Sequence, residues 1–262
     1  MQSNLIYNKE LLEGRNAMVT GGATGLGRAI AVGLAQVGAK VTIVSRQEDV
    51  LSEAVKHISD QTGKSNILAR LKEINIQVDQ NQESLSKLID LIKDNEFKGF
   101  SYDTAEASFE LLARKTLQKV PEYFSIGRFR VMDERRFNAK GEMVVESEAS
   151  VTLRIGENSF HEVAIGNGPV NAVDMALRKA LKKIYPSLDD VMLVDYKVRI
   201  IDSGAGTEAT TRVLIECQES NGDRWRSVGL STNIIDASVM ALSDALTWRL
   251  LTSGIEPSSP TN

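Results

Sequence analysis

The sequence predicts a chain of mixed α/β and α+β class: one βαβ fragment, a helical linker, and then a duplicated βββα unit. Three observations support this prediction. Two stretches of the second half repeat one another, a glycine-rich turn separates two short apolar runs near the start, and the residues between these regions have helical periodicity. The 262 residues are enough for one large domain or two smaller ones, each with a hydrophobic core.

The repeat is clearest in two stretches with the same alternation. Residues 148–155 read EASVTLRI and residues 208–215 read EATTRVLI. In both, apolar residues fall on one face of an extended strand, which is typical of a half-buried strand. These residues are Ala149, Val151, Leu153 and Ile155 in the first copy, and Ala209, Thr211, Val213 and Ile215 in the second. The sequence therefore predicts two equivalent strands.

The elements after these strands are also duplicated. A second short strand is expected at residues 160–165 and again at 225–230, and each is followed by a helix. The helices share the pattern of residues 171–177 and 236–242. Because the offset between copies grows from 60 to 65 residues, we expect a longer hairpin loop in the second copy, near residues 220–223.

Composition excludes several classes of function. The net charge is −4 with no basic tract, and aromatic residues make up only 5%, so no nucleic acid partner is expected. No apolar run reaches membrane-spanning length, and the first residues lack a signal-peptide core, so no membrane partner is expected. The single Cys217, on the apolar face of its strand, fits a reducing compartment and a buried position. We therefore expect a cytoplasmic protein.

The first 57 residues predict a βαβ unit. An apolar strand at residues 16–20 enters a glycine turn, and a helix follows with Leu26, Ile30, Leu34 and Val37 on one stripe. Gly38 is expected to end this helix, and residues 40–45 form the second strand. Glycines in such a turn let a pyrophosphate approach backbone N–H groups at the helix N-terminus.

This Rossmann-like fragment resembles the start of a short-chain dehydrogenase/reductase. The family's Thr-Gly-x-x-x-Gly-x-Gly motif is present as Thr20, Gly21, Gly25 and Gly27. After the second strand the chain has Ser45 and Arg46, where an NAD-preferring member would carry an acidic residue. The resemblance implies cofactor contacts at Gly21, Gly25, Gly27, Ser45 and Arg46, with a preference for NADP.

The resemblance to a reductase ends near His57. The family's catalytic Tyr-x-x-x-Lys pair has no counterpart, because none of the five tyrosines is followed four residues later by lysine. We therefore favour a packing unit with an intact loop over a working dehydrogenase. No cofactor is required by this interpretation, although NADP remains compatible with the loop.

The middle of the chain, residues 58–122, predicts a helical linker. The polar stretch 61–66 is expected to form a turn that starts a helix at residues 67–73. Two amphipathic helices are expected at 82–95, with Leu85, Leu88, Ile89 and Ile92 inward, and at 102–117. Residues 63–65 read Gly-Lys-Ser, but Ile58 stands where a Walker motif needs glycine, so we reject a P-loop.

Residues from about 58 to 251 resemble the C-terminal part of citramalate synthase, within the isopropylmalate synthase superfamily. The stretches that carry the resemblance are GKSNILARLKE (63–73), YDTAEASFELLARK (102–115), GNGPVNAVDMALRKAL (166–181) and LVDYKVRIIDSGAGTEA (193–209). The resemblance implies an allosteric domain at residues 123–251, in which two βββα units pack together and a branched-chain amino acid binds at a homodimer interface. Isoleucine is the typical effector of citramalate synthases and leucine that of isopropylmalate synthases. Residues 252–262 are expected to be a flexible tail.

The catalytic barrel of that superfamily has no counterpart in the sequence. Its metal site uses a His-x-His pair and an aspartate, whereas the two histidines here are His57 and His161. We therefore expect no catalytic residues and no metal site. Two alternatives stay open: an NADP-dependent oxidoreductase, and a complete acyltransferase like the parent citramalate synthase.

A free amino acid needs N–H donors, an acceptor for its ammonium group and an apolar slot. The N–H groups of Gly166, Asn167 and Gly168, at the start of a helix, could hold a carboxylate, although a plain helix start is equally compatible. Asp195 could take the ammonium, with a salt bridge to Lys197 or Arg199 as the alternative. The predicted effector site is Gly166, Asn167, Gly168, Asp195, Tyr196, Gly204 and Gly206, the last two in a loop that could equally be a simple turn.

Overall fold

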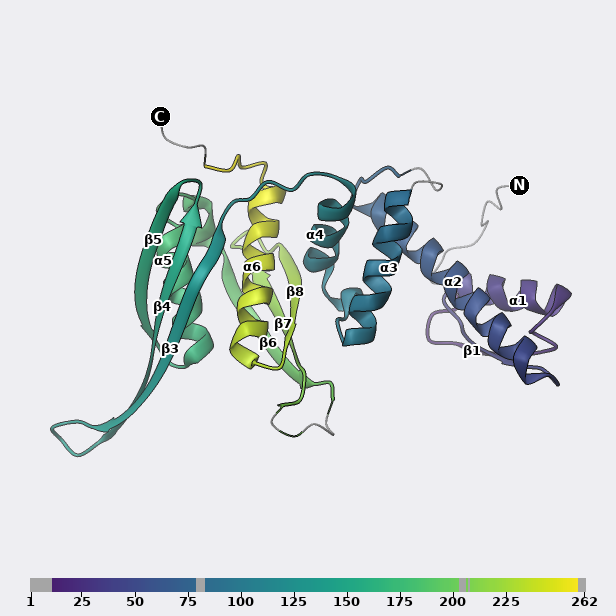
Figure 1. Cartoon of the computed structure of the whole chain (residues 1–262), viewed down its shortest axis with the longest axis horizontal. Helices are drawn as coiled ribbons and strands as arrows, with labels where there is room; N and C mark the ends of the chain where they lie inside the picture. Colours follow the sequence, from purple (N-terminus) through teal and green to yellow (C-terminus); the bar gives the residue numbers. More distant parts are fainter. Residues whose placement is uncertain (1–10, 79–82, 203–205, 207, 259–262) are drawn as a thin grey trace. The chain divides into compact units, whose positions relative to one another are not determined.

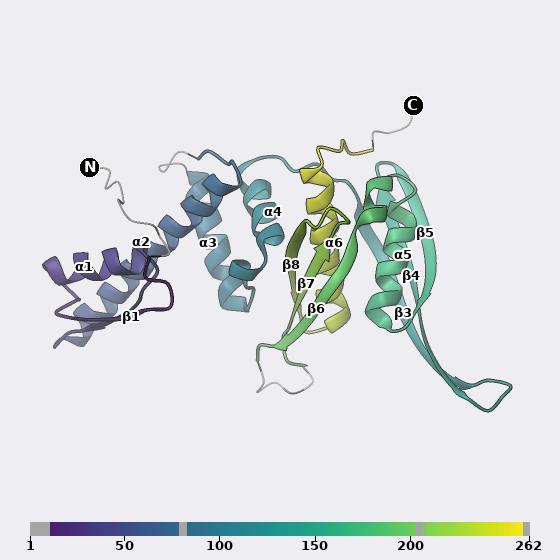
Figure 2. The same cartoon turned by 180° about the vertical axis from the view of Figure 1, so that it is seen from behind.

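The computed structural model describes residues 11–78, 83–202, 206 and 208–258 (Figures 1 and 2). The chain divides into two compact units, Met1–Ile89 and Asp90–Asn262. Each unit is treated by itself.

The first unit contains the predicted βαβ arrangement. β1 (Asn16–Thr20) runs parallel to β2 (Lys40–Val44), and α1 (Gly25–Gln36) connects them. Gly38 lies just beyond α1 with a φ of +93°, a left-handed conformation that glycine adopts without strain. The expected strands, helix and glycine stop are therefore confirmed.

The apolar stripe of α1 is only partly buried. Of Leu26, Ile30, Leu34 and Val37, which share this stripe, Leu26 is 79% exposed and Ile30 is 47% exposed. The buried centre of the helix is Ala31, which packs with Val19, Ile58 and neighbouring apolar residues. The reason is that a two-stranded sheet covers only a narrow side of a helix, so an apolar stripe cannot be buried along its whole width.

α2 (Glu48–Glu73) is one continuous helix. The turn predicted at residues 61–66 is therefore wrong, and the expected boundary between residues 57 and 58 falls inside this helix. A single glycine such as Gly63 costs a helix only about 1 kcal/mol, which a long helix tolerates.

The helices that follow agree with the predicted periodicity. α3 (Glu83–Lys98) buries Leu85, Leu88, Ile89 and Ile92, as expected. The predicted helix at 102–117 is a short 3₁₀ turn, η1 (Tyr102–Thr104), followed by α4 (Glu106–Leu117).

The second unit contains two copies of a βββα arrangement. The first copy is β3 (Ser125–Phe137), β4 (Met143–Ile155), β5 (Asn158–Gly166) and α5 (Pro169–Leu181). After η2 (Pro186–Asp190), the second copy is β6 (Met192–Ile200), β7 (Thr211–Gln218), β8 (Arg224–Ser231) and α6 (Ile234–Thr252). Each copy forms its own antiparallel sheet with the strands in chain order. Residues 156–157 join β4 to β5, whereas residues 219–223 join β7 to β8, so the longer hairpin loop of the second copy is confirmed.

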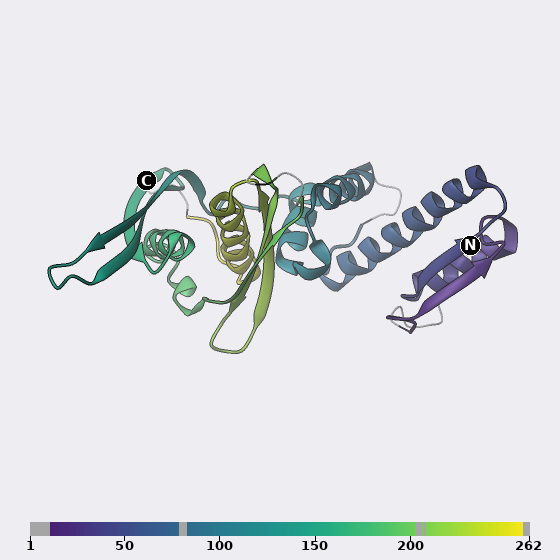
Figure 3. The ribbon, with the colours of Figure 1, turned by 90° about the horizontal axis from the view of Figure 1, so that it is seen from below.

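The two copies share one hydrophobic core. α5 and α6 contact each other and lie between the two sheets (Figure 3). Val151 and Leu153 of β4 and Val213 and Ile215 of β7 are fully buried in the same cluster. Cys217 is buried with them, and burial raises the pKa of its thiol to about 12. The duplication predicted from the sequence therefore folds as a single packed body.

α4 covers the free edge of the second sheet. The Ser108 hydroxyl accepts a hydrogen bond from the backbone N–H of Val228 at 3.0 Å, and the Glu106 carboxylate accepts one from the N–H of Arg226 at 2.9 Å. An uncovered edge strand would expose these donors to pairing with another chain. α4 is thus a structural part of the second unit.

Candidate functional site

A pocket of about 530 Å³ lies between α5 and the start of β6. Of the predicted effector residues, Tyr196 is among those that line it. The residues that line it are Val170, Asn171, Asp174, Arg178, Val191, Met192, Leu193 and Tyr196. An apolar wall with a few converging polar groups is typical of a small-molecule site.

An ion pair forms the polar wall of this pocket. The Arg178 Nε donates to both carboxylate oxygens of Asp174, at 2.8 and 2.9 Å, and its Nη1 donates to the Val191 carbonyl at 2.6 Å. Burial raises the pKa of Asp174, and the positive charge of Arg178 opposes that shift. The hydrogen bond from Arg178 to Val191 therefore joins α5 to the segment that enters β6, and Asp174 holds the guanidinium of Arg178 in place for it.

A β-bulge shapes the opposite wall. The register of β6 with β7 shifts between Leu193 and Asp195. Leu193 and Tyr196, which simple alternation would place on opposite faces, therefore both pack against the core. The Tyr196 hydroxyl is 2.9 Å from the Ser238 hydroxyl on α6, which holds the ring in place.

The predicted effector residues divide into two groups. Tyr196 lines the pocket, and the turn of Gly166, Asn167 and Gly168 leads into α5 beside it. The Asn167 N–H donates to the Asn171 side-chain oxygen at 3.1 Å, which joins this turn to a residue of the pocket wall. At Gly166 a Cβ would lie 2.5 Å from the backbone nitrogen of Ala172, so the turn can approach α5 this closely only with glycine.

The other group lies outside the pocket lining. Asp195 forms an ion pair with Lys197, and this hydrogen bond lowers the pKa of the Asp195 carboxyl. The salt bridge considered as the alternative for Asp195 is therefore present. Gly206 has a φ of +59°, a conformation that favours glycine, and Gly204 lies outside the described residues.

The glycine turn of the first unit has the geometry that its motif demands. Gly21 and Gly25 have φ values of +70° and +51°. A Cβ on Gly27 would lie 2.2 Å from the Gly21 carbonyl oxygen, so the helix can pack onto the turn only with glycine. Ser45 and Arg46 follow β2, and the Ser45 hydroxyl accepts from the N–H of Gln47 at 3.5 Å.

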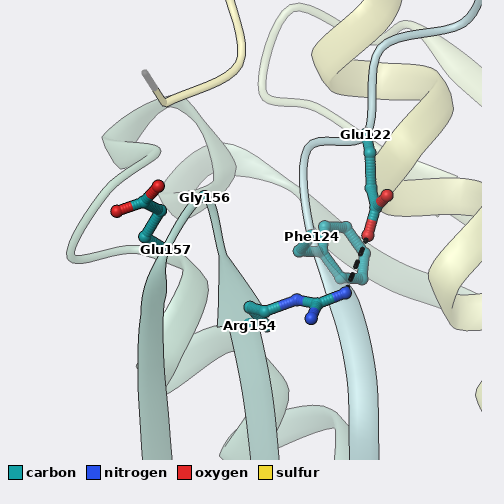
Figure 4. Close-up of a pocket in the computed structure, with 5 residues that line it drawn as sticks. All are labelled: Glu122, Phe124, Arg154, Gly156 and Glu157. Atoms are coloured by element: carbon teal, nitrogen blue, oxygen red, sulfur yellow. Dashed lines mark ion pairs between the residues drawn. The ribbon is translucent and has the colours of Figure 1, made fainter. Parts of the chain in front are cut away.

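A second cavity, of about 510 Å³, lies at the β4–β5 loop and contains none of the predicted site residues (Figure 4). Glu122 and Arg154 face each other across it at 3.9 Å, with Phe124, Gly156 and Glu157 around them. Its lining is as much polar as apolar in character, and it offers no apolar slot like that beside α5.

Within the described ranges, no cluster of three or more His, Cys, Asp or Glu side chains could hold a metal ion. Over the same ranges, no helix combines the length and the apolar character needed to cross a bilayer.

The family profile described as the LeuA allosteric (dimerisation) domain matches residues 103–249. These residues include α4, both βββα copies and the pocket. The chain belongs to the LeuA allosteric (dimerisation) domain family. A profile described as short chain dehydrogenase matches residues 15–95, further along the chain than the sequence resemblance near residues 11–57 suggested.

Curated relatives agree with this assignment over most of the chain. The (R)-citramalate synthase of Geobacter sulfurreducens is 45% identical over 193 residues, and that of Aquifex aeolicus 42% over 194 residues; each alignment covers 74% of this chain and 36% of the relative. The 2-isopropylmalate synthase of Erwinia tasmaniensis is 28% identical over 202 residues, with 35% of the relative covered. The chain thus spans about a third of the length of these LeuA-domain relatives.

Among solved structures, a putative short chain dehydrogenase from Escherichia coli CFT073 is 26% identical. The match covers 27% of this chain and 37% of that one, with a TM-score of 0.21.

Sequence reasoning missed Asp174, Arg178 and Val191. A signal for the first two is their spacing of four residues on one helix, which places an acid and a base on the same face. No local signal places Val191 opposite them, because that contact depends on how the two copies pack.

Proposed function

We propose that this chain is the branched-chain amino-acid-sensing and homodimer-forming regulatory part of a citramalate or isopropylmalate synthase-like protein. The observation that carries the proposal is the pocket between α5 and β6, which lies inside the LeuA allosteric domain and is bordered by the predicted Tyr196 and the turn before α5.

The chemistry of the pocket supports an amino acid with an aliphatic side chain. Val170, Val191 and Leu193 offer an apolar wall for that side chain. The first N–H groups of a helix have no partner within the helix, so the start of α5 suits a carboxylate. The Asp174 carboxylate, already paired with Arg178, supplies negative charge for the ammonium group.

Calorimetric titration of the full chain with isoleucine and with leucine tests this proposal. We expect heat of binding with one of them, and an affinity at least about tenfold lower in Met192→Ser, because this side chain of the wall would be lost. Met240→Ser on α6 is the matched control: both methionines are about half exposed, but Met240 is outside the pocket lining. Absence of heat with both isoleucine and leucine, or equal affinity in both variants, would contradict the proposal.

The homodimer is supported by the family description and is tested by light scattering of the full chain. A mass of one chain at every concentration would contradict it. The substrates and the activity of a parent synthase are proposed only by analogy with the named relatives.

NADP binding at the glycine turn is a second candidate. The positive φ values of Gly21 and Gly25, the close approach at Gly27, and Arg46 after β2 support it. Arg46 would neutralise a 2′-phosphate. Titration with NADPH is expected to give saturable binding that Gly27→Ala abolishes, and absence of binding would remove this candidate.

A further inference from the structure

The hairpin of β3 and β4 projects beyond the rest of its sheet (Figures 1 and 3). β5 pairs with β4 only from Ser147 onward, so beyond the pair of Asp133 and Ser147 the residues 134–137 and 143–146 form a ribbon of two strands. We call these two segments and the turn between them the arm. Among the described residues of the second copy, β7 begins only at Thr211, aligned with Val151 of β4, so no paired strands there correspond to the start of β4.

The arm is an ordered structure with a closed tip. The Asn138 side-chain oxygen accepts hydrogen bonds from the N–H groups of Lys140 and Glu142, at 2.9 and 3.0 Å. Gly141 turns the chain with a φ of +76°. Pairing continues without a break from Ser147 opposite Asp133 to Met143 opposite Phe137.

The two faces of the arm differ in character. One face continues the side of the sheet that packs on α5, and it carries Phe137, Met143 and Val145, which are 69%, 60% and 54% exposed. On the other face, Arg136 forms ion pairs with Glu134 at 3.3 Å and with Glu146 at 2.9 Å. The charged side chains pair with one another on their face, whereas the three apolar side chains on the opposite face are each more than half exposed.

A two-stranded ribbon is marginally stable by itself in water. Three large apolar side chains held on one face of such a ribbon indicate that the face is covered in the functional state. The charges of the arm and its base nearly balance, with Asp133, Glu134, Glu142 and Glu146 against Arg135, Arg136 and Lys140. Two of them, Asp133 and Arg135, lie opposite Ser147 and Val145 and so share the face of the apolar side chains. A nearly neutral arm with both signs suits contact with an identical molecule, because two copies do not repel each other.

We propose that the apolar face of the arm, formed by Phe137, Met143 and Val145, docks onto a second copy of this chain and anchors the homodimer. The proposal rests on the homodimer proposed above. The arm lies within residues 103–249, the range matched by the dimerisation-domain profile, which favours a second copy over an unrelated partner. Aromatic and methionine side chains are also enriched at protein–protein interfaces relative to the rest of the surface.

The test uses the full chain with Phe137→Ser and Val145→Ser combined. Both side chains are exposed, so their loss leaves the core of the unit intact. Sedimentation velocity over a range of concentrations should show a dimer dissociation constant at least about tenfold above that of the unchanged chain, because two buried apolar side chains would be lost from the interface. The matched control is Phe97→Ser, a phenylalanine that is 94% exposed on α3 and far from the arm in sequence, and its dissociation constant should not change.

A second measurement is hydrogen exchange of residues 134–137 and 143–146 above and below the dissociation constant. We expect slower exchange in the dimer, confined to the arm and whatever surface it covers. If the unchanged chain is a monomer at all concentrations, the homodimer fails and the arm proposal with it. If the chain dimerises but the arm variant dimerises equally well, or if Phe97→Ser weakens the dimer as much, only the arm proposal is overturned.

Discussion

The two βββα copies differ in ways that their shared sequence pattern does not reveal. The first copy carries the arm on its hairpin and begins its helix at Gly168, which offers no side-chain cap. The second has a longer β7–β8 loop, and Asn233 caps its helix. Both bury equivalent strand residues in one core. The comparison teaches that the buried faces of a duplicated unit stay alike because they share a core, whereas the edges are free to differ and take on separate roles.

The largest difference in stability between the two copies is expected in the third strand of each copy, β8 and β5, at its first core residue. Trp225 of β8 aligns with Phe160 of β5, but Trp225 is fully buried and its indole N–H donates to the Ala245 carbonyl at 3.1 Å, whereas Phe160 is only partly buried. Trp225→Ala should reduce the free energy of unfolding by about 3–5 kcal/mol, and Phe160→Ala by roughly 1–3 kcal/mol. Urea unfolding of the full chain, followed by the fluorescence of Trp248, measures both. Equal losses would show that the copies contribute equally at this position.

The next difference concerns how closely each helix approaches its sheet. A Cβ on Gly229 would lie 1.9 Å from the carbonyl oxygen of Ala237 on α6, whereas the aligned residue of the first copy is Ala164. Gly229→Ala should therefore destabilise the fold by about 1–3 kcal/mol, because backbone has to move. The reverse change, Ala164→Gly, should cost only about 0.5–1 kcal/mol. Thermal unfolding monitored by circular dichroism compares them, and a neutral Gly229→Ala would mean that α6 can shift freely.

Helix capping should give a smaller effect. The Asn233 side chain accepts from the N–H groups of Ile235 and Asp236, at 2.8 and 3.4 Å, and Asn233→Ala should cost about 1 kcal/mol. The aligned residue is Gly168, beside which a Cβ would meet nothing within 4 Å. Gly168→Asn should therefore stabilise the fold by about 0.3 kcal/mol by supplying the missing cap. The same unfolding experiment measures both changes, and a loss of stability in Gly168→Asn would show that the two helix starts are not interchangeable.

The smallest effect is the pH dependence of one carboxylate in each copy. Hydrogen bonds from Arg226 and Arg224 lower the pKa of Glu216 in the second copy, and those from Lys183 and Lys179 lower the pKa of Glu162 in the first. A lowered pKa in the folded state gives a contribution that is present above the unfolded pKa of about 4.3 and is lost as the pH falls through the folded pKa. Glu216→Gln and Glu162→Gln should each flatten the fall in stability below about pH 4.3.

Unfolding midpoints between pH 3 and 7 would measure this slope, on the order of 0–1 kcal/mol in total for such surface pairs. Glu157→Gln, in the exposed β4–β5 loop, is the control and should leave the slope unchanged. An unaltered slope in both test variants would mean that other carboxylates govern acid unfolding.

The fold could be predicted mainly where apolar residues recur with the period of a strand or helix and the element has one buried and one exposed face. Val151 and Leu153 alternate with polar residues, Val213 and Ile215 occupy the matching face of the second copy, and all four are buried as expected. The prediction failed at residues 61–66, where a polar stretch was expected to form a turn but lies inside α2. Leu26 lies on a good helical stripe, but a sheet of two strands cannot cover it.

The candidate site could be predicted only in part. The sequence pattern predicted Tyr196, which lines the pocket, and Gly168, which immediately precedes the helix that forms one of its walls. Asp195 was also selected, but it pairs with its neighbour Lys197, because opposite charges two residues apart in a strand share a face. Asp174 and Arg178 were missed because nothing in a helical sequence says which of its faces meets another element.

The sequence by itself determined the duplication, the strand and helix faces and the glycine turns, because these follow from the local period of apolar residues and from backbone sterics. Only the tertiary structure decided that the two copies share one core, that a bulge turns Leu193 and Tyr196 to the same side, and that the hairpin extends past its sheet. Such features arise from packing between segments far apart in the chain, where volume and hydrogen-bond partners have to match and local pattern carries no information.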